Sequence, residues 1–191
     1  RLQRGEILLD GTPLHLRSNQ DAIEAGIAYV SEDRLSLGVN LKQPISDNVA
    51  ITVLDKLAGA LGLVSPQSRS RLAEQWVERL GIRAANVAAA VQTLSGGNQQ
   101  RVVLAKWLAT NPKVLILDSP TVGVDVRNKQ GIYDVVRELA SEGVAILLIS
   151  DEVPEVYFNS DRILHMRDGR IAGEFTPGVA SDHALSEALY A

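Results

Sequence analysis

The sequence predicts an α/β protein with a parallel core, antiparallel hairpins and an inserted helical subdomain. Two short apolar runs, residues 114–117 and 144–150, flank a helical pattern, as parallel strands covered on both faces do. Two Asp-Gly pairs lie between apolar segments and indicate tight hairpins. Residues 45–92 carry mostly helical spacing and no convincing strand pattern, which indicates the insertion.

The first 44 residues are expected to supply a hairpin, a short helix and a strand to the core. The hairpin is predicted within "EILLDGTPLHL", residues 6–16, because Asp-Gly tolerates the positive φ angles of a tight turn. A short helix is predicted over residues 20–25. The apolar run "IAYV", residues 27–30, is predicted to form a short buried strand.

The inserted segment, residues 45–92, is expected to form two helices. Ser46 and Asp47 are suited to cap a helix that runs towards Leu61. Apolar residues at helical spacing predict a second helix over residues 68–80, which a glycine then ends.

The predicted core comprises residues 1–44 and 93–191, so the chain is expected to hold one domain with the helical subdomain inside it. Its later elements alternate between helix and strand before a closing hairpin. They are a helix at 98–110, a strand at 114–117, a helix at 127–141, a buried strand at 144–150 and a hairpin at 163–175.

Composition restricts the function classes. The chain has 191 residues, 46% of them apolar, which fits a globular domain. A net charge of -4 argues against nucleic acid as the main partner. The absence of cysteine excludes disulfides, thiolate zinc sites and thiol catalysis. No apolar run approaches the ~20 residues that cross a bilayer, and the first residues do not resemble a signal peptide, so we expect any membrane role to depend on a partner.

Two short segments carry the chemistry of the sequence. Asp118 follows a buried parallel strand, at the sheet edge where α/β proteins bind ligands, and such an aspartate can hold Mg²⁺. The alternative is a turn or helix-capping aspartate. Ser95, Gly96 and Gly97 open a predicted helix, where the serine can cap and the glycines allow backbone N–H groups to approach a phosphate. The alternative is an ordinary capped helix after a loop.

Together, "LSGGNQQR" and "VLILDSPTVGVD" resemble the signature motif and Walker B strand of ABC-type ATPases, a branch of the P-loop NTPases. The matching residues are Ser95, Gly96, Gly97 and Gln99 in the signature, residues 114–118 in Walker B and Asp125 in the D-loop. The "LSGGNQQ" variant and the upstream "VSEDR" resemble the carbohydrate (monosaccharide) importers, in which one ATP-binding subunit contains two fused ATPase halves. The resemblance is to the carboxyl-terminal half.

The sequence also departs from the family pattern. It contains no G-x-x-x-x-G-K-[ST] loop, which the family places just before residue 1, so the chain resembles a half that lacks its Walker A region. Glu32 stands at the Q-loop position, where many relatives have glutamine. Ser119 stands at the position of the catalytic glutamate, and a hydroxyl is a poor general base. Asp151 stands at the switch-histidine position, where its charge would repel the γ-phosphate.

The resemblance implies ATP and Mg²⁺ as cofactors, with the signature acting on the ATP of the partner half and this half's own catalytic site degenerate. It implies as partners a second ATPase half, a transmembrane permease and, indirectly, a periplasmic sugar-binding protein, at the cytoplasmic face of the bacterial inner membrane. The alternatives are a soluble ABC-type ATPase and a non-hydrolysing structural or regulatory half. The isolated chain is expected not to hydrolyse ATP. Gln100 and Arg101 are expected on a solvated helix face.

Overall fold

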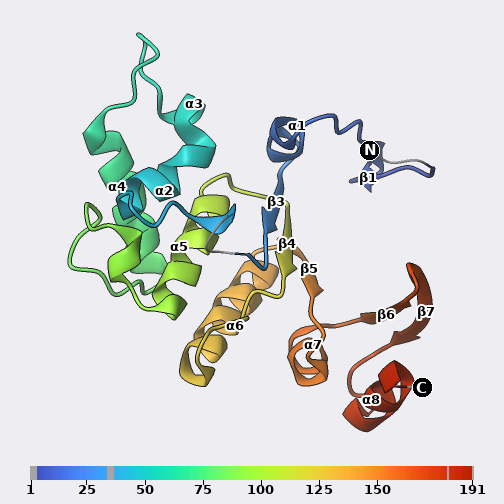
Figure 1. Cartoon of the computed structure of the whole chain (residues 1–191). Coiled ribbons are helices and arrows are strands. Elements are labelled where there is room, and N and C mark those ends of the chain that lie inside the picture. Colours follow the sequence, from blue (N-terminus) through green and yellow to red (C-terminus); the bar gives the residue numbers. More distant parts are fainter. Residues whose placement is uncertain (1–3, 34–36, 180, 191) are drawn as a thin grey trace. The chain divides into compact units, whose positions relative to one another are not determined.

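The computed structural model describes residues 4–33, 37–179 and 181–190 of the chain (Figure 1). The chain forms two compact units, Arg1–Leu147 and Leu148–Ala191. The predicted α/β class is confirmed, because parallel strands, antiparallel hairpins and helices are all present.

Both predicted Asp-Gly hairpins are confirmed. In the first, β1 (Leu8–Leu9) pairs antiparallel with β2 (Thr12–Pro13). In the second, β6 (Ile163–Arg167) pairs antiparallel with β7 (Arg170–Phe175). The turn residues have the positive φ angles that the Asp-Gly pair tolerates: 52° at Asp10, 74° at Gly11, 50° at Asp168 and 73° at Gly169.

The parallel sheet has the strand order β3-β4-β5 among the described residues. The helix α1 (Asn19–Glu24) precedes β3 (Ile27–Val30), and β3 pairs in parallel with β4 (Val114–Asp118). At the start of β5 (Ala145–Ile149), the Ala145 amide donates to the Lys113 carbonyl over 2.9 Å. Alternate side chains of β3 and β4 are fully buried and form the core beside the sheet: Ala28, Val30, Leu115 and Leu117.

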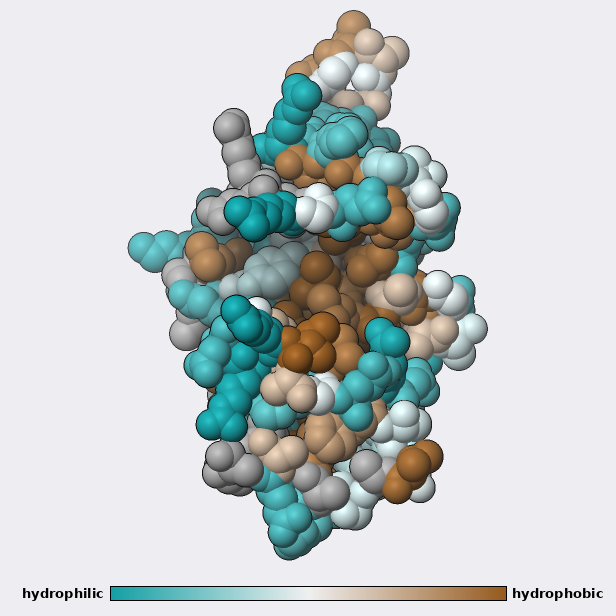
Figure 2. All heavy atoms as spheres, turned by 90° about the vertical axis from the view of Figure 1, so that its right-hand side faces the viewer, coloured by the Kyte–Doolittle hydropathy of each residue, from teal (hydrophilic) through white to brown (hydrophobic). Residues whose placement is uncertain are grey.

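The prediction that β5 is a buried strand is correct for the strand and wrong for its burial. Leu147 is 51% exposed and Ile149 is 45% exposed. Since β5 is the last strand in the order of the described sheet, its outer edge has no described strand beside it. Hydrophobic side chains also reach the surface on the face shown by the space-filling view (Figure 2). The apolar run therefore predicted the extended conformation of β5 correctly, but it did not predict that the side chains of Leu147 and Ile149 are exposed.

The first inserted helix is shorter than predicted. The helix α2 (Ile45–Ala50) is followed by a 3₁₀ turn and then by α3 (Leu54–Leu57), so no single helix reaches Leu61. The expected cap by Ser46 and Asp47 is wrong, because Pro44 occupies the N-cap position and no side chain caps the helix. Burial explains the difference: Ser46 lies inside the first turn and is itself buried.

The second inserted helix, α4 (Pro66–Arg79), agrees with the prediction and begins slightly earlier. The Ser65 hydroxyl caps it by accepting from the Ser68 amide over 3.1 Å. Pro66 suits the first helical position, where its missing N–H removes no helical bond. Ala73 is fully buried, and α4 packs against α2 and α5.

Two further helices follow. The helix α5 (Gly96–Leu108) contributes a fully buried face, and α6 (Val126–Ser141) packs beside it. The fully buried side chains of these helices are Val102, Val103, Leu104, Ala105 and Ile132. No described helix is long and apolar enough to cross a membrane.

The expectation that Gln100 and Arg101 lie on a solvated face is wrong. Gln100 is only 2% exposed. The Arg101 guanidinium donates through Nη1 to the carbonyls of Leu80, over 2.7 Å, and Gly81, over 3.0 Å. These carbonyls lie at the end of α4 and need a donor from elsewhere, so Arg101 joins α5 to α4.

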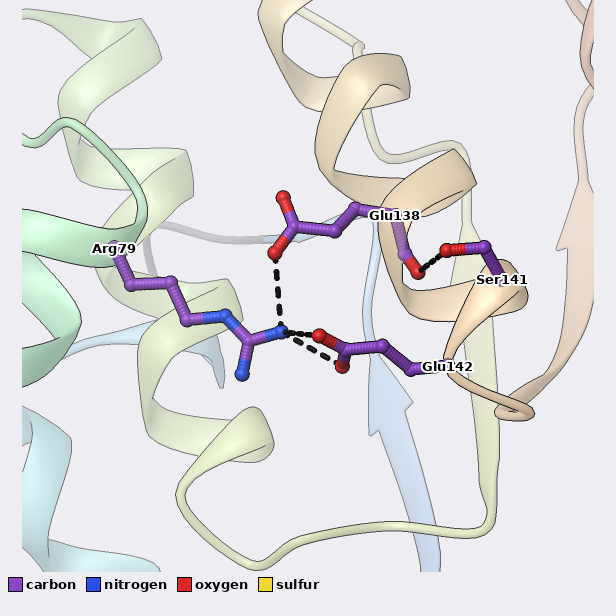
Figure 3. A network of polar contacts seen from close by, with 4 residues as sticks. All are labelled: Arg79, Glu138, Ser141 and Glu142. Atoms are coloured by element: carbon purple, nitrogen blue, oxygen red, sulfur yellow. Dashed lines mark hydrogen bonds and ion pairs between the residues drawn. The ribbon is translucent and has the colours of Figure 1, made fainter.

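A polar network joins α4 to α6 (Figure 3). The Arg79 Nη2 atom donates to both carboxylate oxygens of Glu142, over 2.6 and 2.7 Å, and to Glu138 over 3.2 Å. The Ser141 hydroxyl donates to the Glu138 carbonyl over 2.6 Å. The network is partly exposed, so each ion pair contributes no more than about 1 kcal/mol.

The second unit has a small core of its own. It contains α7 (Val153–Asn159), the hairpin of β6 and β7, and α8 (Asp182–Tyr190). The buried residues are Val153, Ile163 and Leu185, with Val156, Tyr157 and Phe175 packed against them.

Candidate functional site

Ser95 lies at the N-cap position of α5, where it is exposed. The expectation that its hydroxyl caps the helix is wrong, because that oxygen accepts from the Asn98 side chain over 2.9 Å. The backbone amide of Gln99 donates to the Ser95 carbonyl over 2.9 Å, which is the first hydrogen bond of the helix. The amides of residues 96–98 therefore precede the helical ladder, and such amides are the donors that bind anions at a helix start.

Gly97 is buried against α6. A Cβ atom built on Gly97 would lie 2.7 Å from Asn128 Cγ and 2.8 Å from Asn128 Cβ. No side chain fits at that separation, so packing against Asn128 requires a glycine here. The Gln99 side chain folds back on the preceding turn, where its Nε2 atom donates to the Leu94 carbonyl over 3.0 Å.

Asp125 caps α6 from the N-cap position. Its Oδ1 atom accepts from the Asn128 backbone amide over 3.1 Å, and its Oδ2 atom accepts from the Asn128 side chain over 2.6 Å. Asn128 therefore contacts both Asp125 and Gly97. The sequence reasoning missed Asn128, although Asp-x-x-Asn at a predicted helix start is a capping pattern that could have indicated it.

Asn98 is a second residue that the sequence reasoning missed. Its side-chain Nδ2 atom donates to the Ser95 hydroxyl, and its side-chain Oδ1 atom accepts from the backbone amide of Arg83 over 2.8 Å. The start of α5 is thus connected to the segment that follows α4. No local pattern indicates this contact, because the two partners are 15 positions apart.

Asp118 lies at the carboxyl end of β4, as predicted, and is half-buried. The Tyr29 hydroxyl of β3 donates to its Oδ2 atom over 2.7 Å. This hydrogen bond to the carboxylate raises the pKa of Tyr29 above its usual value, because ionised Tyr29 would lose the bond and face a second negative charge. Tyr29 pairs in register with Ile116, so its side chain reaches forward along the strand to the sheet edge.

Asp118 fits a Mg²⁺ ion that is held mainly by water and phosphate. Within the described residues no three histidine, aspartate or glutamate side chains gather to enclose a metal. Tyr29 holds Oδ2, which leaves Oδ1 to face a cation. Mg²⁺ in nucleotide sites takes one or two carboxylates and completes its shell with water and phosphate oxygens, so one aspartate suffices.

Ser119 adopts a backbone conformation that is unusual for its residue type. Its φ angle is 46°, in the left-handed region, and its carbonyl accepts from the Val122 amide over 3.2 Å. Non-glycine residues in this region cost about 1–3 kcal/mol and collect at functional sites. Ser119 is adjacent to Asp118 but brings a hydroxyl, which cannot polarise water as a carboxylate does.

Glu32 and Asp151 are both exposed. Glu32 follows β3, and its charge adds to the effect of Asp118 in raising the pKa of Tyr29. Asp151 belongs to the second unit and follows β5, next to the Ser150 hydroxyl that accepts from the Glu152 amide over 3.1 Å. The structure thus brings Ser95, Gly97 and Asp125 together around Asn98 and Asn128, and it places Asp118 and Glu32 around Tyr29.

Comparison with known proteins gives close relatives. The chain is 45% identical, over 184 residues, to the ribose import ATP-binding protein of Agrobacterium fabrum, covering 96% of this chain and 36% of that protein. It is 46% identical, over 173 residues, to the xylose import ATP-binding protein of Geobacillus kaustophilus, covering 91% of this chain and 34% of that protein. The chain thus spans little more than a third of the length of these relatives.

Solved structures with the same fold are ATP-binding cassettes. A dimeric cassette in a post-hydrolysis state, bound to ADP and phosphate, superposes with a TM-score of 0.75 at 22% identity, covering 91% of this chain and 74% of that one. A nucleotide-free cassette from an ABC transporter superposes with a TM-score of 0.75 at 20% identity, covering 99% of this chain and 74% of that one. The predicted ABC ATPase fold is therefore confirmed. Since the profile described as "ABC transporter" also matches residues 1–122, the chain belongs to the ABC transporter family.

Proposed function

We propose that this chain acts as an ATP-binding half of a bacterial sugar importer and couples ATP binding and hydrolysis to transport. Its similarity to ribose and xylose import ATP-binding proteins supports the transport role. The observation that carries the nucleotide role is the start of α5, where Ser95 is exposed and the amides of residues 96–98 precede the helical ladder. Such a helix start binds the phosphates of a nucleotide.

In this proposal the signature residues Ser95, Gly96, Gly97 and Gln99 act on ATP held by a second ATPase half. Gly97 and Gln99 act indirectly, because one packs on Asn128 and the other holds the preceding turn. Asp125 supports the same surface by capping α6.

The chain's own catalytic site is degenerate in this proposal. Asp118 would hold Mg²⁺, which supplies positive charge to the phosphates, while Tyr29 keeps the carboxylate oriented. Ser119 lacks the carboxylate of a general base, and Asp151 carries a negative charge where a histidine would stabilise phosphate. Glu32 approaches the metal or a membrane partner.

The remaining assignments follow from the same proposal. Residues 45–92 form the helical subdomain of a core made by residues 1–44 and 93–191. The partners are a transmembrane permease and, indirectly, a periplasmic sugar-binding protein, and the chain acts at the cytoplasmic face of the inner membrane.

The test is ATP turnover by the assembled ATPase with Ser95→Arg in this chain. Ser95 is exposed, so an arginine there leaves the fold intact and blocks the helix start. We expect turnover to fall about 10²-fold or more, the usual effect of removing phosphate-stabilising donors. Gln67→Arg, on the exposed first turn of α4, is the matched control and should leave turnover unchanged. Unchanged turnover with Ser95→Arg would refute the role of the signature.

A further inference from the structure

The side-chain carboxamide of Asn98 lies between Ser95 and Arg83, and only one orientation satisfies both neighbours. Its Oδ1 atom accepts from the backbone amide of Arg83 over 2.8 Å, and its Nδ2 atom donates to the Ser95 hydroxyl over 2.9 Å. A backbone amide donates and does not accept. Turning the carboxamide over would therefore place two N–H donors against each other at Arg83. The Arg83 amide thus fixes which end of Asn98 faces Ser95.

The segment that carries the Arg83 amide is itself held in place after the end of α4. Ile82 is buried, and its amide donates to the Val77 carbonyl over 2.9 Å. Gly81 turns the chain with a φ angle of 59°, and its carbonyl accepts from the Arg101 guanidinium over 3.0 Å. Because these contacts anchor the residues just before it, the Arg83 amide is a fixed donor.

The orientation of Asn98 decides what the Ser95 hydroxyl can do. A hydroxyl has one proton to donate and two lone pairs that accept. Since the Nδ2 atom of Asn98 only donates, the Ser95 oxygen is the acceptor in their bond. Ser95 caps no helical amide, and within residues 4–33, 37–179 and 181–190 its hydroxyl makes no other hydrogen bond. Its proton therefore remains to be donated outwards from an exposed position at the start of α5.

We propose that Asn98 is a positioning residue that commits the Ser95 hydroxyl to donate its proton to an anion at the start of α5. The inference rests on the proposed function, in which that anion is the phosphate of ATP held by a second ATPase half. The donated proton adds to the donors of residues 96–98. A hydroxyl that donated to its own chain would instead turn its lone pairs towards the phosphate. Asn98 acts through Ser95 and makes no contact with the nucleotide in this proposal.

The substitution Asn98→Asp separates this role from a structural one. Aspartate has nearly the same shape and both its oxygens accept, so the Arg83 amide keeps its acceptor while the Ser95 hydroxyl turns inwards to donate. Asn98 is the third residue of α5, where the helix dipole favours a carboxylate. If Asn98 only stabilised the helix start, the variant would fold and turn over ATP as the original does. If it directs Ser95, the variant should keep its thermal unfolding temperature and lose turnover.

The experiment is a double-mutant cycle on the assembled ATPase, in a full-length version that carries both Walker A loops, with turnover measured at saturating ATP. We expect Ser95→Ala to lower turnover about tenfold or more, as for a lost hydrogen bond to a charged group. In the Asn98→Asp background the same change should lower turnover less than about twofold, because the donation is already lost. The control Gln92→Glu makes the same amide-to-carboxylate change at an exposed position before Ser95 and should leave turnover unchanged.

A second measurement needs neither nucleotide nor a change at Asn98, so it also decides the case in which Asn98→Asp does not fold. NMR of the isotope-labelled chain follows the two carboxamide protons of Asn98. We expect one of these signals to move in Ser95→Ala, because that variant removes the acceptor of the proton. The carboxamide of Asn48, which donates to the carbonyls of Asn40 and Pro44, is the internal control and should not move.

The outcomes distinguish this inference from the proposed function. The positioning role is supported if Ser95→Ala loses its effect in the Asn98→Asp background and shifts the Asn98 signal. Additive losses, an unshifted Asn98 signal or full turnover in Asn98→Asp would overturn it and leave the role of the signature standing. Unchanged turnover in Ser95→Ala would refute the role of the signature, and the positioning role would fail with it.

Discussion

At the scale of single residues, Gly97 and Asp125 meet through one side chain, Asn128. Asn128 bonds to both oxygens of Asp125 and leaves no space for a side chain at Gly97. Packing inside the chain is therefore a physical reason for a glycine at position 97. A change at Asn128 should therefore alter the signature helix and the D-loop together.

The first residue-scale prediction concerns this contact. Gly97→Ala should destabilise the chain by about 1–3 kcal/mol, because the new Cβ overpacks against Asn128. In the double variant with Asn128→Gly, the loss of stability should be smaller than the sum of the losses in the two single variants. Urea unfolding of the four proteins measures the coupling. Strict additivity would contradict the contact.

The second residue-scale prediction concerns pH. Burial lowers the folded-state pKa of Lys106 from its ordinary value of 10.5, so the unfolded chain binds more protons between the lowered value and 10.5. The unfavourable burial is complete below the folded-state pKa and is relieved as pH rises towards 10.5. Lys106→Met should therefore have a larger free energy of unfolding than the original chain at neutral pH. The difference between the two free energies should shrink as pH rises. Denaturant unfolding of both proteins across that range checks it; a constant gap would contradict it.

At the scale of elements, local patterns predicted the strands and hairpins well. Asp-Gly pairs specify positive φ angles at Asp10 and Asp168, and apolar runs specify extended segments such as β4. The same reasoning failed where distant parts of the chain decide the outcome. Arg101 reaches the end of α4, and Tyr29 reaches Asp118 across the sheet, and no spacing in the sequence encodes either contact.

The element-scale prediction concerns the outer edge of β5. A strand edge with exposed apolar residues is a template for association, so the isolated chain should form dimers or larger species as its concentration rises. Leu147→Lys places a charge on the strand and should reduce association. Leu61→Lys, in an exposed loop of the helical subdomain, is the control and should not. Sedimentation at several concentrations measures this; a monomer throughout would show that water satisfies the edge.

At the scale of the whole molecule, the two groups of candidate site residues differ in their suitability for catalysis. The chain has the ABC ATPase fold and a helix start held by packing on α6. In the proposed function, the Ser119 hydroxyl and the Asp151 carboxylate occupy the positions where catalysis needs a carboxylate and a histidine. The 191 residues of the chain cover little more than a third of the ribose and xylose relatives. These facts support a division of labour in which this chain completes a partner's site while its own site hydrolyses slowly.

The most direct test of this division is a single-turnover measurement on the assembled ATPase, in a full-length version that carries both Walker A loops. Labelled ATP is bound at both sites, and hydrolysis is counted per assembly. The account predicts a fast phase of about one ATP per assembly, because a missing general base slows a site about 10²–10⁴-fold. In Ser119→Glu with Asp151→His, the fast phase should approach about two ATP per assembly. A fast phase of about two in the unmodified protein would contradict the account, since Ser119 would then support hydrolysis as a glutamate does.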